Sequence, residues 1–356
     1  MSRRLTGALL ALLVLGLAAA AAPQIEVDSD TYDFGSILEG FAIEHTFVLT
    51  NTGDETLVID QVRATCGCTT TGLATNELQP GQSVELDAVV GTTGFGGSTI
   101  SKSIYVYSND PEYSDGFGPD KLVLRITGTV VRAEPYRITT EDLYLDSYLL
   151  VDLRPAAEYS TGHILGAINI VPSELKTELA SFELPESAIV FMYDETGSGT
   201  KAIAEGLAAA GTFAMSLNGG LSQWVLGYDD SYIIPQGAEL ELDAPVLVPS
   251  RSANVLDTAL LREYLHVIID LRSSEAFAEG HLIGAANVPN DTFDLISLRA
   301  AVGDLPLDAK IILYDTSGDL SDARAQELNG YGYANAKSLV GGLDYWQQTY
   351  GSQLIW

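Results

Sequence analysis

The chain is poor in positive charge. Its 356 residues include 18 lysines and arginines against 48 aspartates and glutamates, which gives a formal net charge of −30. A surface of this sign repels nucleic-acid phosphates and anionic lipid headgroups, so we expect no nucleic-acid partner and no membrane binding through a basic patch. An acid-rich, lysine-poor surface also suits saline surroundings. A saline habitat is therefore a hypothesis, which destabilisation by molar salt would contradict.

Cysteine is nearly absent, because the sequence contains only Cys66 and Cys68, in the segment TCGCTTT. Two ligands are too few for a closed zinc site without help. The pair could be redox-active or sulfur-accepting, since a disulfide across one residue closes a very small ring and is reduced more easily than a structural bridge. It could also bind a soft metal such as Cu(I), or have no chemistry. Beyond that open metal question, the sequence predicts no cofactor.

Long apolar runs are missing except at the N-terminus. The segment MSRRLTGALLALLVLGLAAAAAP places two arginines before an apolar run from Ala8 to Leu17, then an alanine tract that ends at Pro23. This order is typical of a secretory signal peptide cleaved in the Ala18 to Ala22 region. A retained anchor, which needs about 20 apolar residues, is the alternative. We expect residues 1–22 to be removed, leaving a periplasmic or secreted protein with no stable membrane insertion.

Residues 23–131 have the pattern of β structure. Apolar and polar residues alternate in IEHTFVLTN and KSIYVYSND, and turn signals recur at NTGDE, LQPGQ and GFGG. Short strands at this spacing predict a small β-sandwich.

An internal repeat begins near residue 136. The segment LLVDLRPAAEYSTGHILGAINIVP at 149–172 is matched by VIIDLRSSEAFAEGHLIGAANVPN at 267–290. SLNGGLSQW is likewise matched by SLVGGLDYW, and the pairing indicates two tandem copies of one fold. Six residues recur 118 positions later: Asp152, Arg154, His163, Gly166, Ala167 and Asn169 as Asp270, Arg272, His281, Gly284, Ala285 and Asn287.

Each copy is predicted to be an α/β domain. Strands such as LLVDL and AIVFMYD are apolar on both faces, which is typical of a parallel sheet covered by helices. The first copy is expected over residues 136–228 and the second over 248–356. The linker between them is placed near YIIPQGAELELDAPVLVP.

These motifs resemble two known families. The pattern DLR, E(Y/F), GHI.GA.N and GG…W, present twice, is similar to the rhodanese domain, and together with the N-terminal match it covers almost all of the mature chain. The first segment, with YDFGSILEG, ATCGCTTT and SNDPE, resembles the Ig-like exported domain DUF1573. The resemblance implies a multidomain protein with an N-terminal all-β Ig-like sandwich followed by two α/β rhodanese-like domains with parallel sheets.

The same resemblance locates two degenerate active-site loops. Active rhodaneses transfer sulfur through a cysteine in a Cys-x-x-Gly-x-Arg loop after the fourth strand. The cysteine position holds Asp194 in FMYDETGSGT and Asp315 in ILYDTSGDLS. The glycine is kept as Gly197 and Gly318, whereas the arginine position holds Gly199 and Leu320.

A carboxylate cannot replace the family's nucleophile, because sulfur transfer needs a thiolate that can hold a persulfide. DETGS at Asp194 also resembles the loop of aspartyl-phosphate enzymes, but that chemistry needs magnesium, further aspartates and a lysine. The sequence shows no such downstream acidic motif, and the second copy, DTSGD, does not preserve the resemblance. The simpler interpretation is that each aspartate caps the following helix or accepts N–H bonds from its own loop.

The remaining shared residues are expected to be structural. Asp152 with Arg154, and their repeat equivalents, should form hydrogen-bonded pairs at strand ends. His163 and His281 lie in turns without a neighbouring metal-ligand cluster in the sequence. The glycine pairs 219–220 and 341–342 should permit tight turns, and Trp224 and Trp346 should lie in the core.

These features favour an exported, non-catalytic protein that recognises or scaffolds a protein partner in the cell envelope. The alternative is a sulfur-relay or thiol-redox protein that uses Cys66 and Cys68. Aspartyl-phosphate chemistry at Asp194 is a third, weaker hypothesis.

Overall fold

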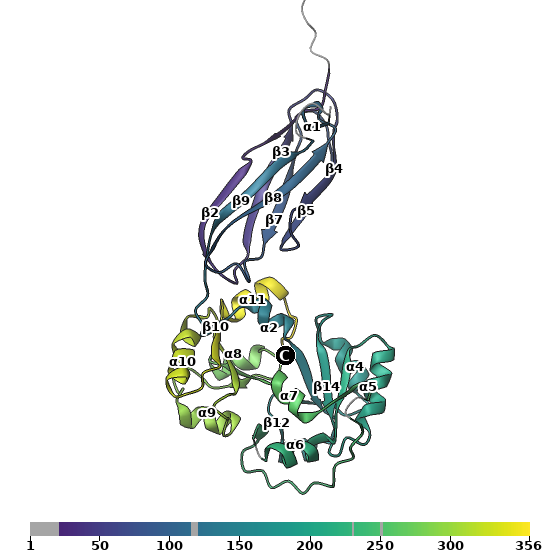
Figure 1. Ribbon diagram of the computed structural model, residues 1–356, viewed down its shortest axis with the longest axis vertical. Coiled ribbons are helices and arrows are strands. Elements are labelled where there is room, and N and C mark those ends of the chain that lie inside the picture. Colours follow the sequence, from purple (N-terminus) through teal and green to yellow (C-terminus); the bar gives the residue numbers. More distant parts are fainter. Residues whose placement is uncertain (1–20, 115–119, 230, 250–251) are drawn as a thin grey trace, which may run out of the picture. The chain divides into compact units, whose positions relative to one another are not determined.

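The computed structural model describes residues 21–114, 120–229, 231–249 and 252–356 (Figure 1). Residues 1–20, which contain most of the predicted leader, lie outside the described residues. The chain divides into two compact units. Among the described residues, one is built from residues 21–35, 42–91, 99–114 and 120–129, and the other from residues 36–41, 92–98, 130–229, 231–249 and 252–356.

The N-terminal β domain consists of two sheets. The first has the order β1-β3-β7-β5, with β1 (Ile25–Val27), β3 (Ile43–Asn51), β5 (Thr69–Leu73) and β7 (Ser83–Val90). The second has the order β2-β9-β8-β4-β6, with β2 (Thr31–Leu38), β4 (Leu57–Ala64), β6 (Glu77–Leu78), β8 (Ser98–Ser108) and β9 (Leu122–Val131). A single helical turn, α1 (Pro111–Ser114), follows β8.

The alternation of buried and exposed residues along the strands explains why this domain has two packed sheets. Every second residue of β7 is buried, from Val84 to Val90, and the intervening residues face solvent. Phe47 and Leu49 of β3 have no exposed surface. A sheet with one apolar face must cover it, and the second sheet supplies buried residues such as Ile104 and Val106. The predicted all-β N-terminal region is confirmed.

The C-terminal unit contains two five-stranded sheets. Their strands are parallel, as the sequence predicted. The first lobe is defined by the sheet order β13-β11-β14-β15-β17, with β11 (Tyr148–Asp152), β13 (Ile168–Asn169), β14 (Ile189–Tyr193), β15 (Ala214–Leu217) and β17 (Val255–Leu256). The second lobe is defined by the order β10-β21-β20-β18-β19, with β10 (Arg137–Ile138), β18 (His266–Asp270), β19 (Ala286–Asn287), β20 (Lys310–Tyr314) and β21 (Ala336–Leu339). β12 (His163–Ile164) and β16 (Ile233–Ile234) form a separate antiparallel pair.

Helices alternate with these strands, as the two-sided burial of the strands requires. The earlier helices are α2 (Thr140–Leu145), α3 (Ala156–Thr161), α4 (Leu175–Ser181), α5 (Thr200–Ala209) and α6 (Gly220–Tyr228). The later helices are α7 (Thr258–Tyr264), α8 (Ser274–Glu279), α9 (Leu295–Val302), α10 (Asp319–Gly330) and α11 (Gly342–Tyr350).

The first strand of each sequence copy completes the sheet of the other copy. β10 pairs in parallel with β21, and the Ser338 N–H donates to the Tyr136 carbonyl at 2.7 Å. β17 pairs with β15 in the same way, and the Ser216 N–H donates to the Asn254 carbonyl at 2.9 Å. The helix after β10 also packs against the other copy, since Tyr144 of α2 stacks on Tyr350 of α11 with ring centroids 3.9 Å apart. The repeat therefore does not delimit two self-contained sheets.

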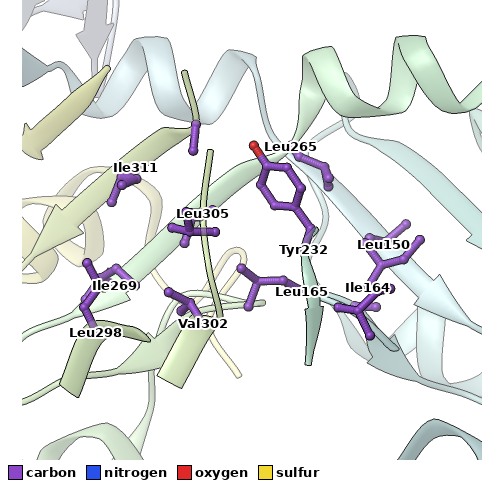
Figure 2. Packing of buried hydrophobic residues seen from close by; sticks show 14 of the residues in the cluster. Leu150, Ile164, Leu165, Tyr232, Leu265, Ile269, Leu298, Val302, Leu305 and Ile311 are labelled. Carbon is purple, nitrogen blue, oxygen red and sulfur yellow. The ribbon is translucent and has the colours of Figure 1, made fainter. Parts of the chain in front are cut away.

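The two lobes share a hydrophobic core. Leu165 of the first copy and Tyr232 at the start of the linker belong to the same buried cluster as Leu298, Val302 and Leu305 of the second copy (Figure 2). An interface of this apolar character is typical of one folding unit rather than of two mobile domains.

A partly buried histidine lies between the lobes. The backbone N–H of His266 on β18 donates to the hydroxyl of Tyr148 on β11 at 2.9 Å. Burial, together with the charges of Lys310 and Lys337, lowers the pKa of the His266 imidazole to about 4, although Asp146 acts in the opposite direction. The imidazole is therefore neutral at pH 7, as an apolar interface requires.

Candidate functional site

Both degenerate loops lie at the carboxyl ends of central strands. The first follows β14 and leads into α5, and the second follows β20 and leads into α10. In open α/β sheets, ligands bind at this edge. The structure thus places Asp194 and Asp315 in loops that follow a strand, as the resemblance to the rhodanese domain implied.

The first loop folds around the Asp194 carboxylate. Its Oδ1 accepts a short hydrogen bond from the Gly197 N–H, and its Oδ2 accepts the Gly199 N–H at 2.9 Å. The backbone carbonyl of Asp194 accepts the Leu221 N–H at 3.0 Å. The carboxylate therefore takes N–H groups that an anionic ligand would otherwise use, as the simpler sequence interpretation expected.

The second loop uses its aspartate as a helix cap. Asp315 is 4% exposed, and its Oδ1 accepts the Ser321 N–H at 3.1 Å in the first turn of α10. Its Oδ2 lies 3.4 Å from the Leu320 nitrogen. Leu320, at the family's arginine position, is half exposed and carries no charge. The two aspartates accept different N–H groups, but each carboxylate accepts them from its own loop or from the helix that follows.

The retained glycines are required by close packing. Gly197 has φ +77°, and a Cβ there would lie 2.7 Å from the Gly219 nitrogen. Gly220 has φ +59°, and a Cβ there would lie 2.5 Å from the Asp194 carbonyl oxygen. The loop and the glycine-glycine turn therefore approach each other too closely for side chains, which confirms the predicted role of the glycine pairs.

The second loop opens on a cleft of about 630 Å³. Its polar lining includes Asp315, Ser317, Asp319, Asn290 and Asp291. Sequence reasoning did not connect Asn290 and Asp291 with this loop. The available signal was their position just after β19, because the carboxyl ends of parallel strands meet at one edge of the sheet.

Arg272 also lines this cleft, but Asp270 already holds its guanidinium group. Arg272 Nε and Nη2 donate to the Asp270 carboxylate at 3.0 and 2.6 Å, and Nη2 donates to the Gly280 carbonyl at 2.6 Å. The first lobe repeats the arrangement with Asp152 and Arg154. These pairs are structural, as predicted, so neither arginine is available as a replacement for the missing loop arginine.

The two repeated histidines are held by local contacts. Nδ1 of His163 lies 2.9 Å from the Tyr159 carbonyl, and its ring stacks on Tyr159 at 3.7 Å. His281 makes the equivalent contacts with Phe277. Burial lowers the pKa of His163, so its ring is neutral at pH 7. The geometry supports the structural role that the sequence favoured.

The two cysteines are joined by a disulfide in the turn between β4 and β5. Thr69 Oγ1 lies 3.2 Å from Cys66 Sγ and 4.0 Å from Cys68 Sγ. Within the described residues, no group of three or more His, Cys, Asp or Glu side chains could hold a metal ion.

Family models match most of the chain. One described as "Protein of unknown function (DUF1573)" matches residues 25–130. Another, described as "Rhodanese-like domain", matches residues 140–226 and 253–349. In the part of the chain that the structure describes, no helix is long and apolar enough to cross a membrane.

Individual relatives match a stretch about as long as one copy. The thiosulfate sulfurtransferase GlpE of Pseudomonas fluorescens (strain SBW25) is 31% identical over 94 residues, which is 26% of this chain and 82% of the relative. GlpE of Pseudomonas entomophila (strain L48) is 32% identical over 84 residues, or 24% and 72% of the two chains. A crystal structure from Porphyromonas gingivalis W83 matches 32% of this chain and 50% of that one, at 20% identity and a TM-score of 0.26.

Proposed function

This chain belongs to the rhodanese-like family, and from that membership we propose that it is a non-catalytic member that acts as an exported binding or scaffold protein of the cell envelope. Its partner would be another protein of that compartment. The observation that carries the proposal is the aspartate in each loop, Asp194 and Asp315, where sulfurtransferases of this family carry a cysteine.

The aspartates remove the family's chemistry in two ways. A carboxylate cannot accept sulfur to form a persulfide, which requires a thiolate. Each carboxylate also occupies N–H groups of its own loop or of the following helix. An incoming thiosulfate would meet a like charge, and two charges about 4 Å apart at an effective dielectric constant near 20 repel by about 4 kcal/mol.

We expect the purified protein to form thiocyanate from thiosulfate and cyanide no faster than the uncatalysed reaction. The measurement is a colorimetric thiocyanate assay, with the Pseudomonas fluorescens thiosulfate sulfurtransferase as the positive control. Asp194→Asn and Asp315→Asn should behave like the wild type, because removing the negative charge does not restore a nucleophile. Robust thiocyanate production by the wild type would refute the non-catalytic proposal.

A role in recognising a partner is supported by the features that surround the two loops. The glycines, the two Asp–Arg ion pairs and the cleft beside Asp315 are present although the nucleophile is not. The cleft is lined by three aspartates, Asp291, Asp315 and Asp319, and with a net charge of −30 it favours a partner surface that carries positive charge.

Export of the protein predicts that the mature chain has a lower mass than the full sequence. Expressed with its full N-terminus in a bacterium, the protein should be recovered from the periplasm or medium lacking about the first 22 residues, as signal-peptide cleavage after the alanine tract requires. Intact-mass measurement would show this shortening. Recovery of the full-length chain in the membrane fraction would instead support the retained-anchor alternative.

A further inference from the structure

The Cys66–Cys68 disulfide lies in an accessible turn of the β domain. Both cysteines are partly exposed, and Gly67 between them is exposed. A Cβ added at Gly67 would meet no atom within 4 Å, so the surface over the bridge is open. A thiol in solution or on a partner protein can therefore approach the two sulfur atoms.

Thr69 makes the two sulfur atoms unequal. Its hydroxyl oxygen is 3.2 Å from Cys66 Sγ but 4.0 Å from Cys68 Sγ. Neither sulfur carries a proton in the disulfide, so the threonine O–H must be the donor. Thr69 is buried at the start of β5, where it pairs with Val90, so the hydroxyl is held beside Cys66.

We propose that this disulfide is a thiol–disulfide exchange site for a dithiol partner, in which Cys68 is the sulfur attacked and Cys66 is the leaving group. The thiolate of the partner forms a bond to Cys68 Sγ. The Cys66–Cys68 bond breaks, and its electron pair leaves on Cys66 Sγ, which accepts the Thr69 O–H as a thiolate.

The second step completes a two-electron transfer. The partner's other thiol, as a thiolate, attacks the partner sulfur of the mixed disulfide, and Cys68 leaves as a thiolate. The partner is oxidised to a disulfide while Cys66 and Cys68 are reduced, and the two protons released by the partner's thiols balance the two thiolates formed. The reverse sequence lets the reduced pair act on a partner disulfide.

The assignment of roles follows from leaving-group chemistry. In thiol–disulfide exchange, the thiol with the lower pKa leaves faster. A hydrogen bond to the charged form of an acidic group favours that form. The Thr69 hydroxyl oxygen is 3.2 Å from Cys66 Sγ but 4.0 Å from Cys68 Sγ, so its hydrogen bond favours Cys66 as the departing thiolate. The site lies outside the rhodanese-like loops, so this inference goes beyond the proposed function and does not depend on the thiocyanate assay.

The test uses the full chain with reduced glutathione as the attacking thiol. The reaction is quenched early with iodoacetamide, and fragmentation mass spectrometry locates each modification. We expect glutathione on Cys68 and the alkyl group on Cys66. Glutathione mainly on Cys66, an equal distribution, or a disulfide that resists millimolar glutathione would each overturn the proposal.

Variants of the threonines separate chemistry from packing. Thr69→Val keeps the shape of the side chain but removes the hydroxyl, and reduction should slow about threefold because Cys66 then leaves without the hydrogen bond to its thiolate. Thr69→Ser should keep the wild-type rate. The control Thr70→Val changes the exposed neighbour and should leave the rate unchanged. Equal rates for Thr69→Val and Thr70→Val would eliminate the role assigned to Thr69.

Discussion

Replacing Asp152 with alanine is expected to lower the free energy of unfolding of the rhodanese-like unit by about 3–5 kcal/mol, because it leaves a buried guanidinium without its counter-ion. Asp152 has no exposed surface and Arg154 is 4% exposed. The carboxylate accepts the Arg154 backbone N–H at 2.9 Å and the side-chain Nη2 at 2.6 Å. After the substitution, the Gly162 carbonyl at 2.7 Å is the remaining partner that the structure gives to Nη2.

Urea unfolding followed by circular dichroism would measure this loss. The matched control is Arg262→Ala, which breaks the exposed pair with Asp308 at 2.8 Å and should cost less than about 1 kcal/mol. The double replacement Asp152→Leu with Arg154→Met should recover part of the loss, because it leaves no unpaired charge. If Asp152→Ala costs no more than Arg262→Ala, the pair does not stabilise the fold as we infer.

Replacing Trp346 with alanine is expected to cost about 3–5 kcal/mol, the range for removing a large aromatic side chain from a packed core. Trp346 is 1% exposed in α11, its ring lies 6.1 Å from that of Tyr144, and its Nε1 donates to the Gln353 carbonyl at 2.9 Å. Since Tyr144 belongs to the helix contributed by the first copy, the cavity would also weaken the strand-exchanged arrangement.

The control for this prediction is Trp356→Ala, since Trp356 is 50% exposed. The loss of free energy of unfolding should be well under half as large, measured for all variants by urea unfolding followed by circular dichroism. Trp224→Ala, at the repeat-equivalent position with no exposed surface, should match Trp346→Ala. Similar losses for Trp346→Ala and Trp356→Ala would contradict the assigned core role.

Much of the fold could be predicted because the type of each element depends on the local pattern of apolar and polar residues. The alternation along Ser83–Val90 predicts a strand with one buried face, and the structure shows that face. The two-sided apolar strands Tyr148–Asp152 and Lys310–Tyr314 predict parallel sheets covered by helices. In both cases, the apolar side chains must be buried, so their pattern determines the type of element and which of its faces is buried.

The exchange of the first strands could not be predicted in the same way. β10 and β17 are two residues long, and their sequences would fit the edge of either sheet. The sheet that each strand joins depends on which sheet edge the preceding chain reaches, so it follows from the path of the whole chain. The contact between Thr69 and Cys66 depends likewise on the turn between β4 and β5.

By itself, the sequence determined that residues 194 and 315 carry a carboxylate and no thiol, whatever their surroundings. It also determined the repeat, the glycines that permit the turns and the acidic surface. The tertiary structure alone decided that each aspartate accepts N–H groups of its own loop or helix, that the copies exchange strands, and that one sulfur of the disulfide receives a hydroxyl. Hydrogen bonds depend on distances of a few tenths of an ångström, and only the packed chain sets those distances.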